Sequence, residues 1–305
     1  MIQLTSLLFS ALWSCFVMAS PVLLTRQQIC NGHAALCDRR YSNVTFMGAH
    51  DSPFVGGTFD LATNQGKGVT AQLDAGIHFL QGQTHLNSEG DLHFCHTYCW
   101  LEDAGPVQNY LASVKSWMDN NPDDVITLLL TNGGNVGVEM FANAFEDSQL
   151  NKYAYMPPHH LSMSDWPTLG EMISNDTRLV VFLDYGANRK KVPYILSEFD
   201  SYMFETPFDT TDPGFPECSL NRPAGGEPDD RMYVMNHFLD KEVLGASVPD
   251  VSALDRTNAA TGFGSIGAQA DICLKKYGRA PNFILVDRFN VGKVRKAQAA
   301  INNIA

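Results

Sequence analysis

The chain has 305 residues, a formal net charge of −12 and a hydrophobic content of 45%. This length and composition are typical of a folded globular protein, and a single α/β barrel domain can be this long. The acidic balance excludes the basic stripe of a nucleic-acid-binding protein. It also argues against electrostatic attraction to anionic membranes.

The first twenty residues, MIQLTSLLFSALWSCFVMAS, contain no charged side chain, and their apolar centre is too short to span a bilayer. We therefore expect residues 1–20 to be a signal peptide and residues 21–305 to form one secreted domain. A buried first helix is the alternative. Sequons at Asn43 and Asn175 are consistent with an extracellular glycoprotein. No second long apolar stretch indicates a transmembrane helix or a lipid anchor.

Removal of the first segment would leave six cysteines, an even number that suggests disulfides in an oxidising compartment. Fifteen pairings are possible in principle. Proximity in the sequence favours the pairs Cys30–Cys37, Cys95–Cys99 and Cys218–Cys273. The alternative for the middle pair is a zinc site that also uses His93 and His96. The C-H-x-x-C spacing matches no common zinc motif and has no second half, so a disulfide is preferred.

Eight runs rich in apolar and β-branched residues recur along the chain, and we expect them to form strands. They lie at 44–49, 78–85, 92–96, 125–132, 179–186, 202–208, 231–238 and 282–289. Helical periodicity predicts helices within 106–122, at 138–147 and at 265–278. Residues 209–230 are rich in Pro, Gly and Asp and are expected to form a long loop held by Cys218.

Continuous apolar strands with helices between them are typical of a parallel sheet buried on both faces. We therefore predict an α/β fold in which eight strands close a (β/α)8 TIM-type barrel; a doubly wound open sheet is the alternative. Active sites of such barrels lie at the carboxyl ends of the strands. The polar side chains at that end are His50, Asp51, Gln81, Gln83, His85, His96, Asn132, Asp184, Glu205, Asn236 and Asp287. Their shared position predicts a functional site there.

Several motifs occur in a specific order along the chain: GAHDSPF at 48–54, QLDAGIHFLQGQTH at 72–85, LHFCHTYC at 92–99, YLASVKSWMDNNPDDVITLLLTN at 110–132 and, more weakly, NFILVDRFNVG at 282–292. These motifs and their order resemble the X domain of phosphatidylinositol-specific phospholipase C. The small secreted fungal branch of this superfamily is similar in its H-T-x-C segment. The resemblance implies a distorted (β/α)8-type barrel and cleavage of a phosphodiester, in which the substrate's own hydroxyl attacks phosphorus.

By position, the resemblance implies that His50 is the general base for this hydroxyl and that His96 is the general acid for the departing alkoxide. It also implies that Asp51 accompanies His96 and that Asp287 orients His50. The chemistry is reasonable, because an alkoxide is a poor leaving group and needs a proton donor opposite the base. Two imidazoles, one neutral and one protonated, can supply both functions near neutral pH.

The chain departs from the family pattern after the second strand, where Gln81 and Gln83 occupy the positions of a D-x-R motif. Loss of the arginine removes a charge that stabilises the transferring phosphoryl group. Calcium-dependent members carry acidic residues at these positions, so we expect no metal and no other cofactor here. The residues considered as a replacement charge are His85 and Arg288, with Arg39 and Arg40 expected at the surface.

Two functions from different classes fit this pattern. The first is a secreted phosphodiesterase acting on a phospholipid or related phosphodiester. Its headgroup would be bound by Gln81, Gln83, His85, Asp184 and Asn236. The second is a barrel that binds such a headgroup without turnover, which the glutamines favour; the two His–Asp pairs favour the enzyme. A metal-dependent lyase or phospholipase D type of barrel is a third possibility. We expect a monomer that contacts membrane surfaces transiently and binds no nucleic acid.

Overall fold

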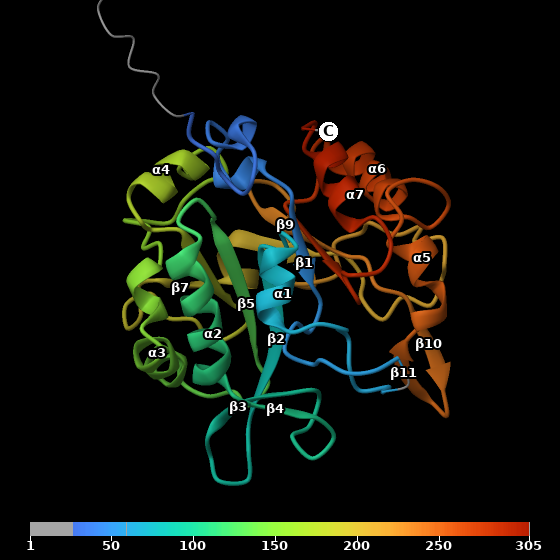
Figure 1. Ribbon diagram of the computed structural model, residues 1–305, viewed down its shortest axis with the longest axis horizontal. Helices are drawn as coiled ribbons and strands as arrows, with labels where there is room; N and C mark the ends of the chain where they lie inside the picture. The colour runs from blue at the N-terminus through green and yellow to red at the C-terminus, as the bar shows by residue number, and fades with distance from the viewer. Residues whose placement is uncertain (1–26, 59, 305) are drawn as a thin grey trace, which may run out of the picture.

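The computed structural model describes residues 27–304 with the exception of residue 59. The predicted signal peptide lies outside the described residues. Eight parallel strands curl around a central axis and helices cover their outer side (Figure 1). The predicted α/β, TIM-type architecture is thereby confirmed. Within residues 27–304, residue 59 apart, no helix is both long enough and apolar enough to cross a bilayer.

The parallel strands follow the order β7-β6-β5-β2-β1-β12-β9-β8. Their bounds are β1 Phe46–Ala49, β2 Phe79–Leu86, β5 Ile126–Asn132, β6 Leu179–Leu183, β7 Ile195–Ser197, β8 Met203–Glu205, β9 Met232–Asn236 and β12 Phe283–Val286. Strand β1 pairs over its whole length with β12 and also with the start of β2. In the described part of the chain no hydrogen bonds pair β7 with β8, so the predicted closure of the ring is incomplete at this seam.

The segment 92–96, which we expected to be a barrel strand, lies outside the parallel ring. It forms β3 (Leu92–Cys95), which pairs antiparallel with the end of β2 and with β4 (Asp103–Pro106). The short turn between β2 and β3 explains this, because a parallel neighbour needs a crossover of a dozen or more residues. The eighth parallel strand is β7, which has only three residues and no helix before it. A polar hairpin, β10 (Asp240–Val243) and β11 (Ala246–Pro249), was also not predicted.

The helices pack against the outer face of the ring. They are α1 Val69–Asp74, α2 Val107–Asn120, α3 Val138–Asp147, α4 Leu169–Ser174, α5 Leu254–Thr257, α6 Ile266–Tyr277 and α7 Val294–Ile301. Short 3-10 turns lie at Ala34–Leu36, Tyr41–Asn43, Leu150–Tyr153 and Val251–Ala253, and a π-helical turn, η4, spans Glu198–Tyr202. Helix α6 begins at the capping hydroxyl of Ser265 and ends at Gly278, whose φ of 69° a glycine adopts without strain. The three predicted helices are confirmed.

Alternate strand residues divide the core into two layers. One layer, which includes Leu128 and Val181, packs between the ring and the helices. The other fills the ring itself, where the rings of Phe79 and Phe283 lie 4.6 Å apart. The aromatic ring of Tyr41 lies 6.1 Å from that of Phe283 and closes the amino-terminal end of the barrel. Side chains therefore fill the barrel interior at its amino-terminal end, and the open space lies toward the carboxyl ends of the strands.

Three disulfides join Cys30 to Cys37, Cys95 to Cys99 and Cys218 to Cys273, as predicted. The zinc alternative for the middle pair is wrong, because a metal would need both sulfurs as thiolates. The third disulfide ties the long loop 209–230, which contains no helix or strand, to α6.

Candidate active site

A cavity of about 620 Å³ opens at the carboxyl ends of the strands. This volume is in the range of small-molecule sites. Ten of the eleven polar residues predicted at the strand ends line it: His50, Asp51, Gln81, Gln83, His85, His96, Asn132, Asp184, Glu205 and Asn236. The eleventh, Asp287, lies behind His50 and contacts its ring. The alternation along β2 places both glutamines and His85 on the cavity side, as predicted.

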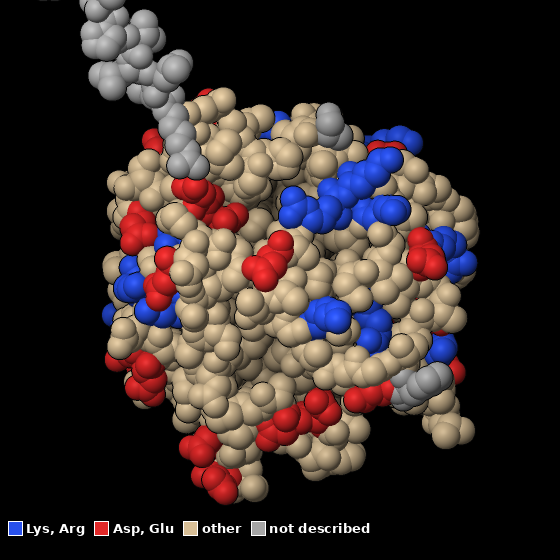
Figure 2. Space-filling model, in the orientation of Figure 1, with Lys and Arg blue, Asp and Glu red and all other residues tan. Residues whose placement is uncertain are grey.

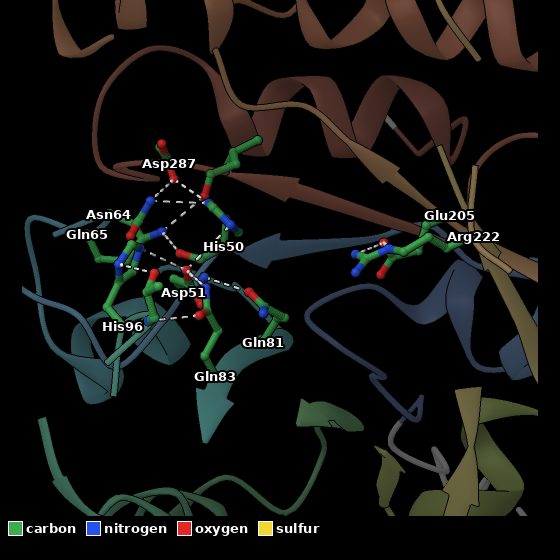
Figure 3. A network of polar contacts seen from close by, with 12 residues as sticks. His50, Asp51, Asn64, Gln65, Gln81, Gln83, His96, Glu205, Arg222 and Asp287 are labelled. Carbon is green, nitrogen blue, oxygen red and sulfur yellow. Dashed lines mark hydrogen bonds and ion pairs between the residues drawn. The ribbon is translucent and has the colours of Figure 1, made fainter. Parts of the chain in front are cut away.

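His50 and Asp287 meet because β1 and β12 are hydrogen-bonded neighbours and each residue directly follows its strand. His50 Nδ1 lies 2.9 Å from Asp287 Oδ1, so this nitrogen carries the proton of the hydrogen bond and Nε2 faces the cavity (Figure 3). Asn64 Nδ2 donates to the same carboxylate oxygen at 3.2 Å. Phe238 stacks on the imidazole with 3.6 Å between ring centroids and 2° between planes. The hydrogen bond to Asp287 therefore fixes one edge of the His50 ring, and the stacking with Phe238 fixes its face.

Asp51 occupies the turn after β1 with a φ of 46°, and its backbone N donates to Gln81 Oε1 at 2.7 Å. Its carboxylate is fully buried, and Oδ2 accepts a hydrogen bond from Gln83 Nε2 at 2.8 Å. The same oxygen lies 3.6 Å from His50 Nε2 and 3.4 Å from His96 Nε2. The two Nε2 atoms are therefore no more than about 7 Å apart. This separation lets a base and an acid flank one phosphorus atom.

His96 comes from the β3–β4 hairpin, so its position depends on a turn outside the ring. The Cys95–Cys99 disulfide closes this turn. Thr97 N donates to Gln83 Oε1 at 3.1 Å, which ties the turn to β2. The imidazole meets the ring of Phe54 edge-on, with centroids 5.1 Å apart. Gln83 thus holds Asp51 with one end of its amide and the turn that carries His96 with the other.

The carboxylates around His50 determine its charge. Burial alone would lower the pKa of His50, but Asp51 and Asp287 outweigh burial and raise the pKa to about 9. Asp240, from the hairpin β10, adds a smaller effect of the same sign. The pKa of Asp240 is itself raised to about 7 by burial and by the nearby Asp287. In the ligand-free site His50 therefore carries a positive charge at neutral pH.

The opposite side of the cavity carries a second polar cluster, with Glu205 and Arg222 at some remove from His50 (Figure 3). Arg222 Nε donates to Glu205 Oε2 at 3.0 Å, and Asn236 Nδ2 donates to the same oxygen at 3.3 Å. Asp184 Oδ1 accepts from the backbone N of Tyr185 at 2.6 Å. Burial raises the pKa of Asp184 to about 6.

The arginines considered as a replacement charge lie elsewhere. The guanidinium of Arg288 donates to Gly56 O at 3.0 Å and to Gly57 O at 2.7 Å, away from the cavity wall. Arg39 and Arg40 donate to backbone oxygens near the amino-terminal end of the barrel. His85 does line the cavity, and its ring rests directly on Gly133, where no side chain would fit.

Sequence reasoning missed several residues that build the site. They are Asn64, Glu198, Arg222, Phe238 and Asp240. Phe238 is the last residue of the predicted strand 231–238 and Asp240 follows two residues later, and that position is a usable signal. The other three belong to loops or to the turn η4, where no periodicity marks them. No group of three or more His, Cys, Asp or Glu side chains within the described ranges is placed to hold a metal ion.

Comparison with known proteins places this geometry in a family. The PI-PLC X 1 family model matches residues 36–302. A "PI-PLC X domain-containing protein 1" from Arthroderma benhamiae is 50% identical over 289 residues, which cover 94% of each chain. An "Uncharacterized secreted protein" from the same fungus is 44% identical, over 92% of this chain and 65% of its own length.

Solved structures agree at the level of the fold. A variant of phosphatidylinositol-specific phospholipase C from Staphylococcus aureus superposes with a TM-score of 0.56 and 12% identity, over 88% of this chain and 95% of its own. The phosphatidylinositol-specific phospholipase C from Listeria monocytogenes gives 0.52 and 15%, over 88% and 95% of the two chains. The family match and the 50% identical relative together show that this chain belongs to the PI-PLC X domain family.

Proposed function

We propose that the protein is a phosphodiesterase of the phospholipase C type, in which a hydroxyl of the substrate attacks its own phosphorus. The observation that carries this proposal is the placement of His50 Nε2 and His96 Nε2 on one buried carboxylate oxygen of Asp51, at 3.6 and 3.4 Å. Membership of the PI-PLC X family and the fold shared with phosphatidylinositol-specific phospholipases C support the same reaction class.

In the proposed reaction His50 is the general base. Its Nδ1 proton is held by Asp287, so Nε2 is the atom that accepts the proton of the attacking hydroxyl. The new oxygen–phosphorus bond forms as the bond from phosphorus to the leaving oxygen breaks, and His96 Nε2 donates a proton to that oxygen. The product is a cyclic phosphodiester, which water can open by the reverse proton transfers. Asp51 lies between the rings and compensates the charge as it moves.

The pKa of about 9 makes His50 a strong base that is rarely neutral at pH 7. About 1% of the free protein would then carry the neutral imidazole. The positive charge on this ring is also the one placed closest to where a phosphoryl group would bind. Among the residues that line the cavity, Arg222 is the one arginine and no lysine occurs, and Arg222 is bound to Glu205. We therefore expect slower turnover than in family members with the D-x-R motif.

A second candidate function, headgroup binding without turnover, is favoured by Gln83. Its amide satisfies Asp51 and Thr97 and supplies no charge to a phosphoryl group. The cavity would then recognise a phosphodiester but would not stabilise the transition state of its cleavage.

Hydrolysis of a panel of phosphodiesters separates the two. The purified protein should cleave phosphatidylinositol or a glycerophosphodiester, which have a hydroxyl next to the phosphate ester, and added EDTA should not change the rate. Phosphatidylcholine has no such hydroxyl and should not be cleaved. His50→Ala should abolish cleavage, whereas His159→Ala, at an exposed histidine outside the cavity, should not affect it. No turnover of any diester by the parent protein would favour the binding function instead.

We also propose transient contact with a lipid surface at the rim of the cavity. The loop after His96 exposes Tyr98 and Trp100, which are 57% and 80% exposed and have stacked rings 5.6 Å apart. Tyrosine and tryptophan favour the membrane–water interface. The hairpins β3–β4 and β10–β11 project from the same end of the barrel (Figure 1). Acidic side chains gather along this lower edge of the face shown in Figure 2, which favours an uncharged or zwitterionic surface.

Sedimentation with phosphatidylcholine vesicles tests this contact. Trp100→Ala should lower the bound fraction at a given lipid concentration. The matched control is Met156→Ala. Met156 is also exposed, at 56%, but it lies two residues after Ala154, which pairs with Leu179 at the start of β6. Met156 is therefore near the amino-terminal end of the barrel, away from the cavity. Equal losses for both variants, or no binding by the parent, would contradict the proposal.

Secretion is proposed on several grounds. The chain has three disulfides, and a 44% identical relative is named a secreted protein. Both sequon asparagines, Asn43 and Asn175, are exposed and open to glycosylation. We therefore propose a signal peptide at 1–20 and a single barrel domain at 21–305. N-terminal sequencing of the protein from culture medium would test the cleavage position.

A further inference from the structure

The side of the cavity away from His50 is acidic. We call Asp184, Glu198 and Glu205 the acidic wall; they come from the end of β6, from η4 and from β8. The cavity as a whole is lined by six carboxyl side chains and, within the described residues, by a single arginine. The three carboxyls of the wall influence one another's charge directly, so they form one cluster.

Glu198 gives this wall a buried hydrogen-bond acceptor that receives no hydrogen bond. The residue is 1% exposed, it lines the cavity, and its Oε1 atom has no hydrogen-bond partner. Burial and the neighbouring Glu205 raise the pKa of Glu198 well above its ordinary value, which favours its neutral form. An unpaired buried acceptor costs free energy in the empty protein, and a ligand that donates to it would remove that cost.

The donors nearest to Glu205 bind this carboxylate. Arg222 donates to Glu205, and its guanidinium lies over the rings of Phe199 and Phe208 at 5.3 and 4.3 Å. The Asn236 amide donates to Glu205 and to Thr206 O at 2.9 Å. With Glu198 neutral, the wall and Arg222 together keep one net negative charge and the open acceptor of Glu198.

We propose that the acidic wall is a subsite for a protonated amine on the headgroup of the bound phosphodiester. An ammonium group has three donors and a positive charge, which match the open acceptor of Glu198 and the net negative charge of the wall. A hydroxyl in the same place would gain less, because it brings no charge. The exposed ring of Tyr185 at the mouth adds a face that favours a cation.

This inference rests on the proposed function for one point, that the ligand carries a phosphate group held near the two histidines. The amine then selects among phosphodiesters by their headgroup. An amino sugar with the phosphate at one end, a free hydroxyl beside it and the amine at the other end has the required chemistry. A headgroup of similar size that carries only hydroxyls lacks the matching charge.

Titration calorimetry on the full secreted chain tests the subsite with glucosamine 6-phosphate and glucose 6-phosphate, which differ in one amine. We expect the amino sugar phosphate to bind about tenfold more tightly, the order of one hydrogen-bonded charge. Glu198→Leu, which removes the open acceptor, and Asp184→Asn, which removes a charge, should each bring the two affinities together, mainly by weakening the amino sugar phosphate. Asp255→Asn, at an exposed acid outside the cavity, should leave the ratio unchanged.

Equal affinities in the parent protein, no binding of either compound, or a ratio unaffected by both wall variants would overturn the inference. Two variants are used because one of them could fold poorly, and thermal melting identifies such a case. The phosphodiester panel keeps the two proposals apart. A protein that prefers the amine but cleaves no diester would disprove the proposed function and leave this subsite standing. A protein that cleaves diesters without an amine preference would do the reverse.

Discussion

The raised pKa of His50 predicts how the stability of the protein depends on pH. A group with a higher pKa in the folded state stabilises the fold below its unfolded pKa, and this stability is lost as pH rises through the folded value. For His50 the window runs from 6.5 to about 9. Its side chain is 16% exposed, so solvent screens the two carboxylates only weakly. The contribution is about 3 kcal/mol below pH 6.5.

Urea denaturation at pH 7.5 and pH 9.5 measures this directly. Between these values the parent protein should lose about 2 kcal/mol of unfolding free energy through His50. Both measured pH values lie above the pKa of about 7 of Asp240, so that carboxyl contributes little to the change. His50→Gln cannot titrate and should show a much flatter dependence. Asp287→Asn should retain part of the slope, since Asp51 still faces the ring.

The control is His159→Gln, because His159 is exposed and remote from the cavity. It should reproduce the slope of the parent protein. The reasoning would be refuted if the parent and His50→Gln lost the same free energy between pH 7.5 and pH 9.5. In that case His50 would not be held as an imidazolium by its carboxylates.

Three further predictions concern the reaction. If His50 is the base, kcat/KM for a nitrophenyl ester, which does not need a protonated His96, should rise with pH up to about 9, and Asp287→Asn should move this rise to lower pH; a profile that falls over that range would contradict the assignment. His96→Ala should impair cleavage of alkyl esters far more than that of a nitrophenyl ester, which leaves without a proton; the same pattern for His50→Ala instead would exchange the two roles. Gln83→Arg keeps a donor for Asp51 and adds a charge, so kcat should rise by about tenfold, and a fall would show that its contact with Thr97 matters more.

Much of the ring could be predicted because buried parallel strands are continuous apolar runs. The segment 125–132 contains β5 almost to the residue, and 282–289 contains β12. The failures have the opposite cause. Strand β7 is too short to form a recognisable run, and β3 resembles a barrel strand in composition although it pairs antiparallel. Composition does not report the partner of a strand, so these two could not be distinguished.

The candidate site divides in the same way. His50, Asp51 and His96 could be identified because they belong to short motifs in a fixed order, and Asp287 because it ends a strong strand. The opposite wall could be predicted only in part. Asp184, Glu205 and Asn236 belong to the ends of predicted strands, whereas Arg222 comes from the long loop 209–230, and only tertiary packing, with the Cys218–Cys273 disulfide, determines that it lies on the cavity. The residues around His50 could thus be predicted better than those on the opposite wall.

The two halves of the proposed catalytic pair have different mechanical support. His50 and Asp287 follow adjacent strands of the ring and share its hydrogen-bonded frame. His96 belongs to a hairpin attached to the end of β2. A disulfide between Cys95 and Cys99, four positions apart in the sequence, braces the turn of this hairpin. Insertions or deletions in that hairpin would move His96, the proposed acid, together with the exposed rings of Tyr98 and Trp100. They would leave His50, the proposed base, in place. Sequence changes in this one hairpin can therefore alter both the protonation of the leaving group and the contact with a lipid surface, while His50 and Asp287 stay unchanged.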